Sequence, residues 1–205
     1  MAAASFTYRP RTGPAMAVAA WALAGLAAVS LAVEQPGLVG RALPTLALVC
    51  LTAWAVFWAP QVVVDDSGLT VRNVLASHHV PWAAITRVDT KWALTLHTAR
   101  GKVTAFAAPA PSSLRPPGQR GVTAREIARL PESTFDAGRS VRPGDLPGTA
   151  SGDLAWVVRE RWQEVRDAGP TGAASGREAT RRWHTAPLAA WAALALAAGL
   201  AAVAG

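Results

Sequence analysis

Hydrophobic residues along this chain concentrate in three long runs, which cover residues 15–33, 42–59 and 186–205. None of the runs contains an Asp, Glu, Lys or Arg residue. A helix of about 18 to 20 residues is roughly 27 to 30 Å long, which matches the hydrocarbon core of a bilayer. The pattern therefore predicts three transmembrane helices over these ranges.

The first run has a second interpretation, as a signal peptide. Arg9 and Arg11 precede it, and Ser30-Leu31-Ala32 before Val33 has the small-residue pattern of a cleavage site. The run is long for the apolar part of a signal peptide, and a second run follows closely, so a retained helix is favoured. A mature chain beginning near Val33 would show cleavage instead.

The ends of the predicted helices carry residues typical of helix starts and membrane interfaces. Pro44 and Pro187 fall in the expected first turns of the second and third helices, where a missing N–H costs little. Trp54 and Trp58 close the second run and Trp183 precedes the third, as in an aromatic belt.

Flanking arginines indicate the orientation. Two precede the first run, whereas the connecting loop at 34–41 carries one acid and one base. Three more lie in the expected linker at 170–185, before the third run. The positive-inside rule therefore predicts a multi-pass cell-membrane protein with its N-terminus (1–14) and central domain in the cytoplasm and loop 34–41 outside. These arginines are Arg9, Arg11, Arg177, Arg181 and Arg182.

Between the second and third runs, the pattern changes to short segments of alternating apolar and polar residues. Asp65-Asp66-Ser67-Gly68 is a strong turn signal, and Arg100-Gly101 predicts a tight turn that closes a hairpin. The pattern predicts about six short strands, and therefore an antiparallel sheet or a small barrel. The strands are expected at 62–64, 69–74, 78–81, 85–90, 92–97 and 102–107.

The remainder of the central region divides into a loop and a helix. Residues 109–150 are rich in Pro, Gly, Ser and Arg and are expected to be mostly loop, with one short helix as the alternative because Thr123 and Glu126 have capping-box spacing. An amphipathic helix is predicted at 152–168, with its apolar stripe packed on the open end of the sheet. The stripe consists of Leu154, Val158, Trp162 and Val165.

The segment Val62–Asn73, followed by Val80–Ile85, resembles the opening of bacterial pleckstrin-homology-like (PH-like) domains. The two preceding runs are similar to those of membrane-anchored actinobacterial members of the low-molecular-weight protein antigen 6 type. The resemblance covers residues 60–108, about a quarter of the chain. It implies a bent antiparallel sheet of seven strands capped by one C-terminal helix. Six strands are readable here, and the segment 109–150 stands where the seventh would be.

The expected fold class is membrane α plus a mostly-β domain. Three transmembrane helices accompany a PH-like antiparallel sheet or barrel at 60–169, capped by the helix at 152–168. The resemblance implies no particular activity, because PH-like folds serve as binding scaffolds for unrelated partners.

Composition supports the membrane class. The chain is 51% hydrophobic and 16% charged, whereas a soluble domain has about 25% charged residues. The formal charge of +7 comes with a strong bias toward Arg, Ala, Gly and Pro that is typical of a GC-rich genome, so no nucleic-acid partner is predicted. The single cysteine, Cys50, lies within a hydrophobic run and gives no information on compartment.

No catalytic, cofactor or metal site is predicted. His78 and His79 are adjacent, so on a strand their side chains point to opposite faces, and a metal site needs three or four converging ligands. They are interpreted as ordinary strand histidines; a metal or catalytic centre that also uses His97 is the weakest alternative. The sequence lacks a phosphate loop and a G-x-S-x-G motif.

Candidate contact residues are one tryptophan and a group of arginines. Trp82, Trp92 and Trp162 occupy apolar positions and are expected in the core, whereas Trp156 lies opposite the helix stripe and is expected to be exposed. Asp65 and the neighbouring Asp66 would repel an anionic headgroup at the first hairpin. The arginines that would contact a partner or the inner leaflet are Arg115, Arg120, Arg125 and Arg129, with Arg139 beyond them.

These patterns favour a non-catalytic membrane protein that presents a PH-like interaction module at the cytoplasmic face of the membrane. Its expected partners are the lipid bilayer and a membrane or cytoplasmic protein. The alternative is peripheral sensing of anionic lipid through the arginine-rich segment.

Overall fold

The computed structural model describes residues 5–10, 12–109, 150–167 and 178–203. The chain divides into two compact units. The first is a β-rich domain made of residues 1–8, 61–73 and 78–181, and the second contains the long helices, with residues 9–60, 74–77 and 182–205.

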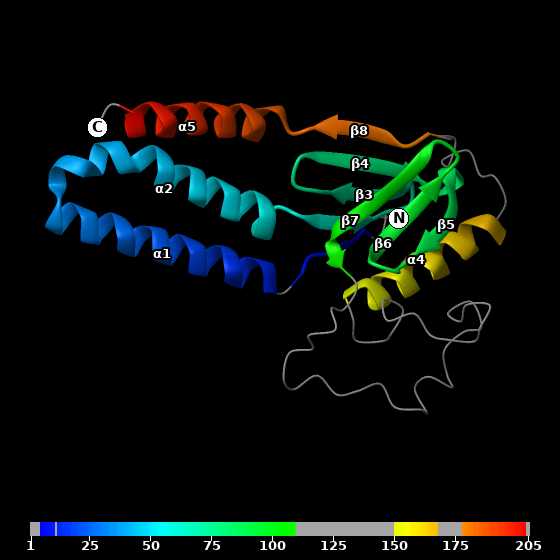
Figure 1. The fold of residues 1–205 in the computed structure, drawn as a ribbon. Helices are drawn as coiled ribbons and strands as arrows, with labels where there is room; N and C mark the ends of the chain where they lie inside the picture. Colours follow the sequence, from blue (N-terminus) through cyan, green and yellow to red (C-terminus); the bar gives the residue numbers. More distant parts are fainter. Residues whose placement is uncertain (1–4, 11, 110–149, 168–177, 204–205) are drawn as a thin grey trace. The chain divides into compact units, whose positions relative to one another are not determined.

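Three helices of the second unit are long and apolar enough to cross a membrane, as the hydrophobic runs predict. The first is α1 (Thr12–Glu34), and the third is α5 (Thr185–Val203). The second combines a 3-10 turn (Pro36–Leu38), α2 (Val39–Ala53) and a π-helical turn (Trp54–Trp58). Helix α2 lies between α1 and α5 (Figure 1).

The second helix begins earlier than the hydrophobic pattern indicates, so the expected loop at 34–41 is wrong. The amide of Gln35 still donates to Leu31 at the end of α1, and Pro36 starts the next turn, where its missing N–H costs nothing. Pro44 consequently lies inside α2 rather than in its first turn. There it removes the hydrogen bond that an amide would donate to the carbonyl of Gly40. Pro187, in contrast, lies in the first turn of α5 as predicted.

Indole groups connect the neighbouring helices. The Trp21 Nε1–H donates to the carbonyl of Cys50 at 3.0 Å, and the Trp191 Nε1–H donates to the Thr52 hydroxyl at 3.1 Å. At Gly13, an added Cβ would lie 2.3 Å from the carbonyl oxygen of Phe57. Small residues and interhelical hydrogen bonds of this kind hold helices together where lipid removes the hydrophobic driving force.

The strands form a five-stranded sheet in the order β1-β2-β3-β4-β8 and a three-stranded sheet in the order β5-β6-β7. Antiparallel pairing is seen between β1 and β2, β2 and β3, β5 and β6, and β6 and β7. All six strands expected from the alternation are present. They are β2 (Gln61–Val64), β3 (Gly68–Arg72), β4 (Ala76–Pro81), β5 (Ile85–Asp89), β6 (Ala93–Thr98) and β7 (Gly101–Pro109).

Two further strands correct the predicted domain boundaries. Strand β1 (Phe6–Tyr8) lies in the expected N-terminal tail, and β8 (Thr180–Trp183) lies in the expected linker. Both occupy the outer edges of the five-stranded sheet. Phe6 pairs with Val64, so pairing with a distant strand, rather than the short local pattern, makes this segment a strand.

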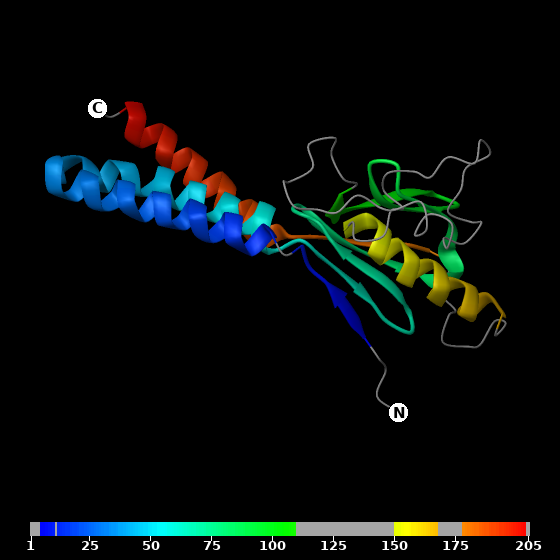
Figure 2. The same cartoon turned by 90° about the horizontal axis from the view of Figure 1, so that it is seen from below.

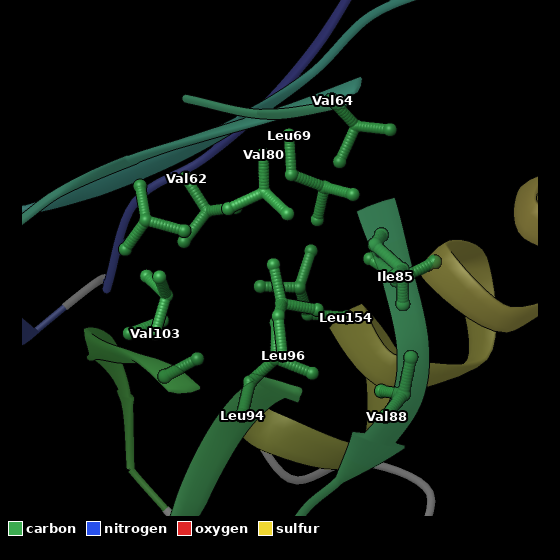
Figure 3. Close-up of a cluster of buried hydrophobic side chains, with 14 of the residues drawn as sticks. Val62, Val64, Leu69, Val80, Ile85, Val88, Leu94, Leu96, Val103 and Leu154 are labelled. Atoms are coloured by element: carbon green, nitrogen blue, oxygen red, sulfur yellow. The ribbon is translucent and has the colours of Figure 1, made fainter. Parts of the chain in front are cut away.

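The apolar faces of the strands and of α4 (Ala150–Asp167) meet in one core (Figure 3). Leu154 and Val158 are fully buried in this cluster, and Trp162 and Val165 pack against it, which confirms the predicted helix stripe. Helix α4 contacts β5, β6 and β7 and thus covers the three-stranded sheet. Trp82, in a 3-10 turn (Trp82–Ala84) before β5, is the largest fully buried side chain among the described residues.

Asn73 joins β3 to β7 across the gap between the two sheets. Its side-chain Nδ2 donates to the carbonyl of Thr104 at 2.8 Å, and its Oδ1 accepts from the amide of Phe106 at 2.9 Å. The side-chain amide therefore takes the place of a neighbouring strand along this part of β7.

Candidate functional surface

Asp65 shapes the first hairpin. Its carboxylate accepts hydrogen bonds from the amide and hydroxyl of Ser67 and from the amide of Gly68. Partial burial opposes ionisation of this carboxyl, but these hydrogen bonds act together in the other direction, and the pKa of Asp65 lies below its ordinary value. Asp65 is thus a charged turn residue, as the Asp-Asp-Ser-Gly pattern indicates.

The same turn is also hydrogen-bonded to a side chain of the core. The Trp82 Nε1–H donates to the carbonyl of Asp65 at 2.9 Å, which satisfies the only polar group of a buried indole. Gly68 has a φ of +157°, and an added Cβ would lie 2.2 Å from the carbonyl oxygen of Val80. Only glycine fits this close backbone approach.

Asp66 forms an ion pair with Arg161 of α4. The hydrogen bonds that the Arg161 guanidinium donates to Glu164 and Asp66 raise the pKa of Arg161 above its ordinary value. Both acids of the first hairpin therefore have partners within the domain. The turn presents carboxylates, and Arg161 of α4 is already paired with Asp66 and with Glu164 of its own helix, an arrangement that does not favour an anionic headgroup.

The three candidate histidines have separate surroundings. The ring Nδ1 of His79 lies 3.0 Å from the hydroxyl of Thr70, and His97 Nε2 lies 4.0 Å from Asp89. Burial lowers the pKa of His78, and the charge of Arg181 lowers it further. Within the described ranges, no group of three or more His, Cys, Asp or Glu residues is arranged to hold a metal ion.

The exposed face of the three-stranded sheet carries mostly polar side chains, and several of them pair with one another. Arg87 and Asp89 form an ion pair at 3.1 Å, and the hydroxyls of Thr95 and Thr104 lie 3.1 Å apart. Phe106 is the apolar exception on this face, and its side chain is 53% exposed.

Trp156 is exposed, as helical projection predicts. Its side chain is 55% exposed on the face of α4 opposite the buried Leu154 and Val158. Asp153 lies three residues before it, and Arg159 and Glu160 lie three and four residues after it, so all three share its side of the helix. An exposed indole among charged residues is a suitable anchor for a partner protein, since tryptophan is enriched among residues that dominate binding.

The predicted core position of Trp92 is wrong. Its side chain is 80% exposed, because β6 begins one residue later and Trp92 belongs to the preceding turn. The carboxylate of Asp89 holds that turn by accepting from the amides of Thr90 and Lys91 at 2.7 and 3.1 Å. The Lys91 ammonium lies 5.7 Å from the centre of the Trp92 ring.

The candidate arginines are not placed by the structure. Arg115, Arg120, Arg125 and Arg129, together with Arg139, lie outside the described residues. The same holds for the capping pair of Thr123 and Glu126.

His184 makes structural contacts that the sequence does not predict. It lies between β8 and α5, and its amide donates to the carbonyl of Leu75 at 3.0 Å. Its ring Nε2 lies 2.8 Å from the Ser77 hydroxyl, and its Nδ1 lies 3.3 Å from the carbonyl of Val74. The only local signal is a lone histidine beside Trp183 before an apolar run, which does not reveal a contact with residues over 100 positions away.

One known protein family matches part of this chain. Residues 59–144, less than half of the chain, match the family model described as Bacterial PH domain. The matched range contains β2 to β7, and it excludes α4, β1, β8 and all three long helices. No curated protein and no solved structure matches the chain significantly.

Proposed function

We propose that this chain is a non-catalytic, multi-pass membrane protein that holds a PH-like interaction module at the cytoplasmic face of the cell membrane. The observation that carries this proposal is the way the candidate spans join the β-domain. Strand β1 leads into α1, the second span leads into β2, and β8 leads into α5, with one to three residues at each junction. Each long helix is thus continuous with a strand of the same sheet.

Short junctions restrict where the domain can go. An extended residue spans at most about 3.6 Å, so a junction of three residues reaches only about 10 Å from the end of its helix. Three such tethers keep the module at the bilayer surface and raise its effective concentration toward other membrane proteins.

The cytoplasmic orientation rests on the flanking arginines. In the sequence, Arg9 and Arg11 precede α1, and Arg181 and Arg182 precede α5, so the basic residues flank the spans at the ends that connect to the β-domain. The spans that accompany a PH-like segment also support kinship with the actinobacterial, antigen 6 type of membrane-anchored protein.

The module's binding partner is proposed to be a protein that uses Trp156 as an anchor. The indole favours a partner surface with an apolar pocket, and the charged residues around it, Asp153, Arg159 and Glu160, favour a polar rim of complementary charges around that pocket. Because Trp156 lies outside the core, its replacement is expected to leave the domain folded.

The test is in-cell crosslinking of the full chain, followed by purification and identification of the proteins that accompany it. The Trp156→Ala variant is expected to recover less of the partner. The matched control is Trp92→Ala, which removes an even more exposed tryptophan from the β5–β6 turn.

Equal loss of partner in both variants would show that Trp156 is not the anchor. If the full chain recovers no more co-purifying protein than an unrelated three-span protein does, the proposed protein-partner role is wrong. Recovery of anionic lipid alone would favour lipid sensing instead.

A further inference from the structure

The turn between β3 and β4 is attached to the start of α5. Residues 74–77 form this turn and the start of β4, and they belong to the same compact unit as the long helices. His184 makes the attachment: its backbone amide bonds the Leu75 carbonyl, and its ring lies against Val74 and Ser77. Three polar contacts to one residue fix the position of the turn relative to the helix start.

Two large apolar side chains are exposed at this attachment. Leu75 is 46% exposed in the turn, and Trp183 is 51% exposed in the residue directly before His184. The turn itself, Val74-Leu75-Ala76-Ser77, carries no charged residue. Exposed apolar residues in an uncharged turn are unfavourable in water, because each leaves its apolar area unburied.

The depth of the turn follows from the helix to which it is bound. Helix α5 begins at Thr185, one residue after His184, and is among the helices long and apolar enough to cross a membrane. If α5 spans the bilayer, His184 lies where the chain passes from headgroups into the acyl region. Any residue bonded to His184 lies at a similar depth.

We propose that the turn 74–77 is a membrane-interface wedge, in which Leu75 inserts into the boundary between headgroups and acyl chains beside Trp183. Its occupant is the lipid bilayer itself. The proposal rests on the membrane anchoring of the proposed function and adds a contact between lipid and the turn that joins β3 to β4.

The chemistry of the neighbouring residues fits this occupant rather than a protein. Tryptophan prefers the membrane interface, where its ring is apolar and its N–H can reach water or headgroups. Arg181 and Arg182 come immediately before it, and each basic residue near an anionic surface contributes about 1 kcal/mol. An apolar side chain held at this height is typically buried about 5 to 10 Å into the interface.

The test places an environment-sensitive fluorophore on single cysteines of the full chain in anionic lipid nanodiscs. Cys50 is the only native cysteine, so Cys50→Ala gives the background. The probe is attached through Leu75→Cys in the wedge and Ala99→Cys, an exposed residue of the β6–β7 turn, as matched control. Leu196→Cys, exposed on α5, provides a reference within the expected span.

Lipids carrying a quencher near the headgroup end of the acyl chain should quench the probe at position 75 and leave position 99 bright. Lipids with the quencher near the chain terminus should act mainly on position 196. Adding His184→Ala to the Leu75→Cys chain should reduce the quenching toward that of position 99, because the turn is then released from α5.

Equal brightness at positions 75 and 99, with position 196 still quenched, would overturn the wedge while leaving the anchoring intact. Absence of quenching at position 196 would overturn both. Unchanged quenching after His184→Ala would overturn the role of His184 in holding the wedge.

Discussion

Of the two β-domain glycines whose surroundings are described, Gly68 and Gly101, Gly68 leaves less room for an added methyl group. Its φ of +157° is unfavourable for any residue with a Cβ, and the Cβ of alanine would lie 2.2 Å from the Val80 carbonyl oxygen and 2.7 Å from the Cα of Pro81. Both neighbours are backbone atoms, so they cannot move away by changing a rotamer. Gly68→Ala must therefore displace the start of β3 from the end of β4.

The expected cost has two parts. Forcing alanine into a left-handed conformation costs about 1 to 2 kcal/mol. Displacing packed backbone to relieve the overlap adds about 1 to 3 kcal/mol, as for other overpacked sites. The free energy of unfolding of the β-domain should thus fall by roughly 2 to 5 kcal/mol, a large share of the stability of a small domain.

Gly101 provides a matched control. It has a similar φ of +153°, but an added Cβ there meets no atom within 4 Å. Gly101→Ala should therefore show the conformational cost alone, about 1 to 2 kcal/mol. The difference between the two variants measures the close approach of Gly68 to β4.

Urea unfolding of the full chain in mild detergent micelles, followed by pulse proteolysis, measures this difference. Proteolysis reports the fraction of unfolded β-domain, while the helices remain protected in the micelle. The reasoning is refuted if Gly68→Ala is no more destabilising than Gly101→Ala, because the Val80 carbonyl then leaves room for a side chain.

Two further predictions concern polar groups of the same domain. Asn73→Asp replaces the amide donor with a carboxylate and should destabilise the domain by about 1 to 3 kcal/mol in the same urea assay, with Asn73→Gln tested for partial rescue. The folded-state pKa of His78 lies below 6.5, so its contribution to stability is present above pH 6.5 and lost as the pH falls through the folded pKa. His78→Gln should remove this part of the pH dependence of the urea midpoint; an unchanged profile would assign it elsewhere.

Local periodicity was sufficient for the elements whose partners are near in sequence. The six alternating strands and their turns follow from residues 61–109, because each strand pairs mainly with the next one along the chain. The exposure of Trp156 follows equally well, since a helix of 18 residues keeps its period. Trp92 shows the limit of this reasoning: the alternation through Leu94 and Leu96 includes it, but the Asp89 turn removes it from the strand.

Contacts made by single polar side chains were not predictable. Asn73 ends a strand, as many asparagines do, and nothing nearby indicates that its amide binds β7 about 30 residues later. His184 likewise has no local pattern that points to Ser77. The Asn73 side chain bonds the backbone of β7, and the His184 ring contacts the turn at residues 74–77. In both cases the partners are distant in sequence, and only the fold brings them together.

The edge strands β1 and β8 were not predicted for a different reason. Each is a short segment that comes just before a long helix in the sequence, β1 before α1 and β8 before α5. Along the five-stranded sheet, the strands joined to helices occur in the order β1, β2, β8, and their helices pack in the same order, α1, α2, α5. The views in Figures 1 and 2 agree on this order of the helices. Connections in the same order need not cross, which is the usual rule for protein chains.

Strands β1 and β8 thus stand directly before long helices, with three residues between β1 and α1 and one residue between β8 and α5. Each becomes a strand by adding to an edge of the five-stranded sheet, where β1 pairs with β2 and β8 neighbours β4. An edge position needs a partner on one side only, so pairing with a distant strand makes up for the weak local β-pattern of these two segments.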